Sequence, residues 1–236
     1  LQSGQDAAAR NVIEEVTRIP GTSAKELEED QLLLRATYFI ETHQWKQAAT
    51  LNLPPGDTFP RDQWQVSWTR TIGAVRSGNA SQARLGFQKL RQAGSFLVAK
   101  AKKSGYNSAG IETAQLEAEA WLEYAEGRHD EAMRTMRKAV TSEGRDSVDI
   151  LGIPAQEMLG DLLQELHRPA DALKSYEAAL QESPNRFDSL YGAAQSAGFA
   201  GDKKQADFYF TTLLRICGPG ADRPELAAAR TYLAER

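Results

Sequence analysis

An alanine recurs along this chain at one place of a repeated two-helix pattern, and this periodicity restricts what the chain can fold into. The pattern is clearest over residues 153–186, where apolar residues at helical spacing lie on both sides of a break at His167-Arg168-Pro169. The repeat alanines are Ala48, Ala83, Ala132, Ala172 and Ala206, separated by 35, 49, 40 and 34 residues. Self-similarity on this scale is typical of arrays of helical hairpins. We therefore expect an all-α chain of about five hairpins.

The glycine, alanine and proline residues within 153–186 predict how one hairpin is built. Pro169 fits the first turn of the second helix, where its missing N–H costs nothing, and Pro184 ends that helix. Gly160 and Ala172 are expected where the two helices cross, because a larger side chain would force the helices apart.

These residues resemble the tetratricopeptide repeat family. The unit over residues 153–186, the fourth of five, carries nearly the whole pattern; the third and fifth carry about half, and the first two carry it weakly. The resemblance runs from about Glu29 to the end of the chain. Residues 154–210 and 222–226 also resemble the carboxyl-terminal part of larger bacterial repeat proteins of unassigned activity. The resemblance implies a right-handed α-solenoid. The family residues of the fourth unit are Leu159, Gly160, Leu163, Ala172, Tyr176, Ala179 and Pro184.

The repeat frame predicts a domain organisation with a helical cap at each end. We expect a capping helix and linker over 1–28, and a capping helix over 221–236. The two long spacings require insertions, one from a long second helix over 81–103 and one over 141–152. The repeat units between the caps are 29–62, 64–112, 113–152, 153–186 and 187–220.

Both caps have sequence signals of their own. At the front, Val12, Val16 and Ile19 form an apolar stripe, and Ser23 with Glu26 predicts a capping box for the next helix. At the end, Asp222 followed by Pro224 and Glu225 predicts an N-cap with a capping box. The stripe of that last helix is Leu226, Ala229 and Leu233.

The sequence favours binding over catalysis, and we expect no enzyme activity, cofactor or metal. It contains no phosphate-binding loop, nucleophile elbow or zinc-protease motif. His43, His129 and His167 each lie near a turn between paired helices, too far apart to share a metal. Cys217 is expected to be a small buried hydrophobe rather than a reactive thiol.

Charge and hydropathy argue against nucleic-acid binding and membrane insertion. The net charge is −4, and no run of apolar residues is long enough to span a bilayer. The chain starts at Leu1 rather than methionine, and its first residues lack the features of a signal peptide, so we expect that residues precede Leu1. The sequence leaves the cellular compartment undetermined. A basic strip on the long helix is expected to be solvated, and it is the best candidate for an anionic contact. It comprises Lys89, Arg91, Lys100, Lys102 and Lys103.

The resemblance implies a concave groove lined by the first helix of each repeat, aromatic at both ends and acidic in the middle. Such a groove favours a basic or apolar peptide. Trp68 and Trp121 are alternatively expected to pack between repeats. Family members that bind chaperone tails use Lys and Asn where the fourth unit has acidic residues and a glutamine, so that role is not expected. The implied groove residues are Trp68, Ile72, Arg76, Glu117, Trp121, Tyr124, Glu157, Asp161, Gln164, Glu165, Tyr191, Gln195 and Phe199.

We therefore predict a scaffold for protein or peptide interaction, whose rigid groove presents preorganised side chains to a partner. Two alternatives belong to other classes of protein. The chain could be the accessory carboxyl-terminal region of a larger enzyme, with the catalytic residues upstream of Leu1. It could also be a self-assembly domain. The oligomeric state is left open by the sequence.

Overall fold

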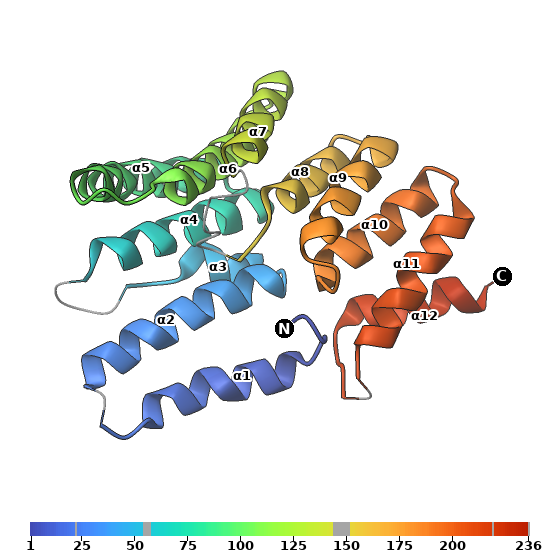
Figure 1. Cartoon of the computed structure of the whole chain (residues 1–236), viewed down its shortest axis with the longest axis horizontal. Coiled ribbons are helices and arrows are strands. Elements are labelled where there is room, and N and C mark those ends of the chain that lie inside the picture. Colours follow the sequence, from blue (N-terminus) through green and yellow to red (C-terminus); the bar gives the residue numbers. More distant parts are fainter. Residues whose placement is uncertain (22, 54–57, 144–151, 219, 236) are drawn as a thin grey trace. The chain divides into compact units, whose positions relative to one another are not determined.

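The computed structural model describes residues 1–21, 23–53, 58–143, 152–218 and 220–235, and these residues form an all-α array, as predicted (Figure 1). Within them lie twelve α-helices and one short 3₁₀ helix, Val16–Arg18. None of these helices combines the length and the apolar character needed to cross a bilayer. The α-helices are α1 (Asp6–Glu15), α2 (Ala24–Glu41), α3 (Trp45–Thr50), α4 (Pro60–Arg76), α5 (Ala80–Lys103), α6 (Ala109–Ala125), α7 (His129–Glu143), α8 (Ala155–Glu165), α9 (Pro169–Glu182), α10 (Phe187–Phe199), α11 (Lys203–Ile216) and α12 (Pro224–Ala234).

The helices pack in sequential pairs, α2 with α3, α4 with α5, α6 with α7, α8 with α9 and α10 with α11. The first helix of a pair also packs on the first helix of the next, as α2 does on α4, α4 on α6 and α8 on α10. The long second helix predicted over 81–103 is confirmed as α5. Of the second predicted insertion, 141–143 continue α7, and 144–151 lie outside the described residues.

By their mutual contacts the residues divide into two compact units. One unit, here the C-terminal unit, combines Pro154–Arg236 with the first ten residues, Leu1–Arg10. The other, the central unit, is Asn11–Ile153. The front of the chain is therefore part of the same compact unit as its end.

Each of the five hairpin turns contains a residue in the left-handed conformation, five positions before the repeat alanine. The N–H that follows this residue donates to the carbonyl five residues earlier, with N···O distances of 2.8 or 2.9 Å. This bond is typical of the Schellman motif, which satisfies the free carbonyls at a helix end. All five repeat alanines are 0% exposed. The left-handed residues are His43 (φ 54°), Gly78 (80°), Gly127 (76°), His167 (55°) and Gly201 (83°).

Glycines on two helices make room for one tyrosine ring of a third. The ring of Tyr176 on α9 is buried, and a Cβ added to Gly160 on α8 would lie 2.8 Å from it. A Cβ added to Gly192 on α10 would lie 2.4 Å from the same ring. The prediction that Gly160 lies at a close contact of the paired helices is confirmed.

The structure corrects the prediction of which residues of the front cap are buried. Val12 and Ile19 are exposed, and Ile13 is the buried residue of α1. Residues 16–18 leave the α-helix for a 3₁₀ turn, so the spacing that would align Val12, Val16 and Ile19 on one α-helical face is interrupted. The capping box of Ser23 and Glu26 at the start of α2 is confirmed.

The predicted end cap is confirmed as a helix, but its capping residue is wrong. Leu226 and Ala229 of α12 are buried, and Leu226 belongs to a cluster with Phe187 on α10 and Leu213 on α11. Arg223 is the N-cap residue of α12 and makes no side-chain capping bond. The carboxylate of Asp222 instead accepts a hydrogen bond from the backbone N–H of Asp6 at 2.9 Å.

We predict that Gly201→Ala and Gly198→Ala have opposite effects on stability. A Cβ on Gly201 meets nothing within 4 Å, so its cost comes from the left-handed backbone, and the free energy of unfolding should fall by about 1 kcal/mol. Gly198 lies in α10 with ordinary Cβ contacts, and its replacement should raise that free energy by about 0.5 kcal/mol. Urea denaturation followed by circular dichroism measures both. Equal changes in the free energy of unfolding for the two variants would contradict a left-handed turn at Gly201.

Gly160→Leu should lower the free energy of unfolding by about 1–3 kcal/mol, because the added side chain overlaps the ring of Tyr176. Thermal unfolding of the variant beside the parent chain measures this loss. An unchanged melting temperature would show that Gly160 is not needed for close packing of α8 on α9.

Candidate functional site

The structure buries the tryptophans that the resemblance assigns to the groove of the central unit. Trp68 on α4 and Trp121 on α6 are each 1% exposed, and Ile72 is also buried. Their side chains offer no accessible face to a partner. Arg76 is half-buried, with its guanidinium carbon 4.9 Å from the ring centroid of Trp121 and 5.1 Å from that of Trp45. It therefore makes a cation–π contact with each ring.

The remaining implied groove residues of the central unit also contact neighbouring side chains. Glu117 on α6 is buried. Tyr124 is half-buried, and its ring packs edge-on against Trp121 and stacks on His129 with 5.4 Å between centroids. These contacts lie within α6 and at the start of α7, so they stabilise this hairpin.

In the C-terminal unit, the implied acidic middle of the groove makes internal hydrogen bonds. Buried Glu157 accepts from Arg186 through both carboxylate oxygens at 2.7 Å and from the hydroxyl of Ser189. Asp161 accepts from the hydroxyl of Tyr176 at 2.6 Å. Gln164 donates to the carbonyl of Gly192 at 3.0 Å. These groups link α8 to α9 and α10.

The last implied groove residues differ in their accessibility. Tyr191 is half-buried, and its hydroxyl accepts a hydrogen bond from the side-chain amide of Gln195 at 3.1 Å. Its pKa is raised, mainly by burial and secondly by the negative charge of Glu225. Phe199 at the end of α10 is exposed. It lines a cavity of about 470 Å³ together with Gln164, Glu165, His167 and Pro169. Three implied groove residues, Gln164, Glu165 and Phe199, are thus brought together at this cavity.

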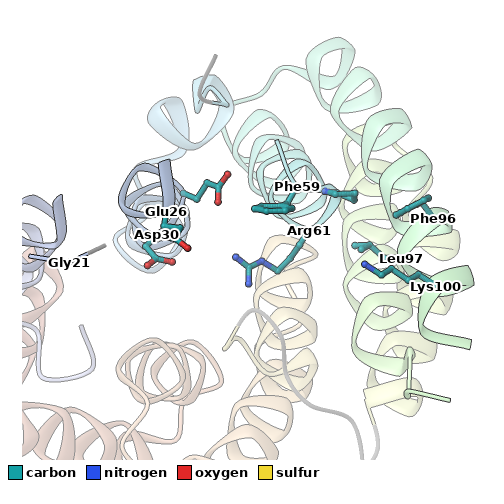
Figure 2. A pocket seen from close by; sticks show the side chains of 10 residues that line it. Gly21, Glu26, Asp30, Phe59, Arg61, Phe96, Leu97 and Lys100 are labelled. Carbon is teal, nitrogen blue, oxygen red and sulfur yellow. The ribbon is translucent and has the colours of Figure 1, made fainter. Parts of the chain in front are cut away.

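A second cavity, the α2–α4–α5 pocket, lies in the central unit and was not predicted from the sequence. Its volume is about 740 Å³, and it opens between the start of α2, the start of α4 and the second half of α5 (Figure 2). It combines accessible aromatic rings with charges of both signs. The lining residues are Gly21, Glu26, Glu29, Asp30, Phe59, Pro60, Arg61, Phe96, Leu97 and Lys100.

Three carboxylates from α2 form one wall of the α2–α4–α5 pocket. Glu26 belongs to the capping box, and hydrogen bonds from the side chain and backbone N–H of Ser23 lower its pKa. Glu29 is buried, and its Oε1 accepts no hydrogen bond among the described residues. The nearest ammonium, from Lys25, lies 3.9 Å from that oxygen, beyond hydrogen-bonding distance. Asp30 is exposed.

Aromatic and basic side chains form the opposite wall. Phe59 and Phe96 are 56% and 55% exposed, so both rings are accessible to a partner. Figure 2 shows Arg61 beside Phe59, with its guanidinium toward Asp30, and Lys100 on α5 beside Phe96 and Leu97. The Lys25 ammonium lies 5.4 Å from the centroid of Phe59, so this ring already accepts a cation on its face.

Sequence signals for this pocket existed but were weak. The long α5 carries Phe96 and Leu97 beyond the length that a regular repeat helix needs. Phe59 stands directly before the proline that begins α4. One member of the basic strip, Lys100, lines the pocket, whereas Lys102 pairs with Glu112 at 3.9 Å. The repeat frame assigns none of these residues to the groove.

Cys217 and the histidines form no reactive cluster. The thiol is half-buried, and burial raises its pKa, so it is mostly protonated at neutral pH. His43 and His167 occupy the left-handed positions of hairpin turns, which explains their place in the sequence. Among the residues that the structure describes, no three His, Cys, Asp or Glu side chains lie together as metal ligands.

The chain is thus an all-helical protein whose helices pack in sequential pairs, with an open pocket lined by aromatic and charged residues. Comparison with protein-family models, curated proteins and solved structures finds no match for it. The pocket and the groove residues must therefore be interpreted from their own chemistry.

Arg186→Met should lower the free energy of unfolding by about 3–5 kcal/mol, because it leaves the charge of Glu157 buried without its guanidinium. Arg168→Met is the matched control, since Arg168 pairs with Asp171 at an exposed site and should cost far less. Urea denaturation measures both. Equal losses would contradict a structural role for Glu157.

Proposed function

We propose that this chain is a protein-interaction module of tetratricopeptide-like hairpins, stacked as a solenoid, and that it binds a peptide segment of a partner protein in the α2–α4–α5 pocket. The role is binding rather than catalysis. Sequentially paired helices support a rigid scaffold, and the pocket supplies accessible rings and charges for recognition.

The buried carboxylate of Glu29 is the observation that carries this proposal. An oxygen of a buried carboxylate without a hydrogen-bond donor costs free energy, and a donor from a partner would remove that cost. Glu29 is one of the residues that line the pocket. Glu26 and Asp30 on the same wall add negative charge.

The chemistry of the two walls indicates the class of peptide. A lysine or arginine side chain suits the carboxylates of α2, and it also suits the face of Phe59, which already lies near one ammonium. An apolar or aromatic side chain next to it would cover Phe96 and Leu97. The proposed ligand is therefore a segment with a basic residue beside an apolar one.

Little ordering is required of the protein when such a segment binds. The pocket is formed by the ends of three helices, and α4 packs on both α2 and α5. A preformed surface lowers the entropic cost of association, so a short segment can bind specifically.

Selection from a phage-displayed library of random twelve-residue peptides tests the proposal. The whole chain should enrich sequences with Lys or Arg beside an apolar residue. Synthetic peptides from that selection should bind Glu29→Gln and Phe96→Ser about tenfold more weakly than the parent chain, because each change removes one recognised group.

Phe208→Ser is the matched control, since Phe208 is 62% exposed on α11 and does not line the pocket. Peptides should bind this variant as they bind the parent chain. Failure to enrich any peptide would contradict the interaction role. Enriched peptides that bind Glu29→Gln and Phe96→Ser normally would place the site elsewhere.

A further inference from the structure

Residues 1–6 form a turn that leads into the first residue of α1, and they contact residues 187–223 of the same compact unit. Gln2 accepts a hydrogen bond from the backbone N–H of Phe187 at 2.7 Å, at the start of α10. The carbonyl of Gly4 accepts from the backbone N–H of Asp222 at 3.0 Å. The backbone N–H of Asp6 donates to the carboxylate of Asp222 at 2.9 Å. Both backbone and side-chain groups of the segment are thus recognised.

Gly4 is required by both its conformation and its surroundings. Its φ of +68° is left-handed, and the residue is buried. A Cβ at this position would lie 3.2 Å from the sulfur of Cys217, 3.2 Å from the ring of Phe187 and 3.4 Å from Ala221. The face that receives the segment therefore selects glycine at this position.

Asp6 is recognised by an arginine that is already positioned. The Nε of Arg223 donates to the carboxylate of Asp6 at 2.8 Å, and its Nη1 donates to Asp188 at 3.2 Å. The Arg223 side chain is 2% exposed, and its guanidinium carbon lies 4.2 Å from the ring centroid of Phe187. An arginine held by a second carboxylate and an aromatic ring presents its remaining donors in a defined direction.

We propose that Phe187, Cys217 and residues 221–223 form a peptide-binding site, that residues 1–6 are its ligand, and that the same segment of a second copy of this chain can occupy it. The ligand class is a segment with a left-handed glycine two residues before an aspartate. Recognition combines backbone hydrogen bonds of this turn with one charge-assisted pair.

Exchange between copies follows from the nature of these contacts. The contacts of Gln2, Gly4 and Asp6 named above all reach residues 187–223, so an identical segment from another molecule would make the same bonds. The proposal involves none of the residues of the α2–α4–α5 pocket and does not depend on the proposed function.

Cys217 provides the readout, because it is the sole cysteine of the sequence and Gly4 lies against its sulfur. In the whole chain, the segment should protect the thiol from an aromatic disulfide reagent. Gly4→Ala should release the segment and raise the labelling rate about tenfold, a change expected when a tightly packed contact is lost. Ser3→Ala is the matched control, since Ser3 is exposed, and it should label at the parent rate.

A synthetic peptide with the sequence of residues 1–10 should then restore slow labelling to the Gly4→Ala chain. Peptides carrying Gly4→Ala or Asp6→Asn should not, whereas a Ser3→Ala peptide should. If Gly4→Ala fails to fold, as judged by circular dichroism, Asp6→Asn replaces it in the chain with the same expectations. Parent-rate labelling of the released variants would overturn the recognition of Gly4 and Asp6. A failure of the parent peptide to protect would overturn exchange.

Discussion

Close approach of paired helices at their turns is the constraint on which the rest of the structure depends. A left-handed residue ends the first helix, and the residue five positions later is an alanine without exposed surface. This geometry appears at all five turns, even though the spacing between them varies from 34 to 49 residues. Variation is therefore confined to helix length and to the connections between hairpins, and the pocket beside the long α5 is one product of that variation.

Histidine at two of these turns shows how composition can mislead a functional interpretation. His43 and His167 stand where other hairpins have glycine, with φ values of 54° and 55°. Histidine tolerates this region better than most residues, so the backbone requirement accounts for its position without any ligand. Glu157 is likewise explained without a ligand, because Arg186 inside the C-terminal unit balances its charge.

The parts of the fold that could be predicted are those encoded within one repeat. Ala172, Pro169 and Pro184 act on residues a few positions away, so their spacing alone places them. Asp222 could not be assigned, because its partner Asp6 lies 216 positions earlier in the chain. The α2–α4–α5 pocket combines residues from three helices, and Trp68 shows that a family groove position can equally be a core position. Such contacts depend on tertiary packing that a repeat frame does not contain.

The membership of Leu1–Arg10 in the C-terminal unit has a consequence for how this protein can be made. A ribosome synthesises these residues long before the residues that they contact, which extend to Arg223. The bonds of Gln2, Gly4 and Asp6 to Phe187, Asp222 and Arg223 can therefore form only when nearly all of this sequence has been synthesised. Contacts so distant in sequence close slowly. A fragment that begins at Pro154 would therefore lack part of its own compact unit, although it contains every helix from α8 to α12.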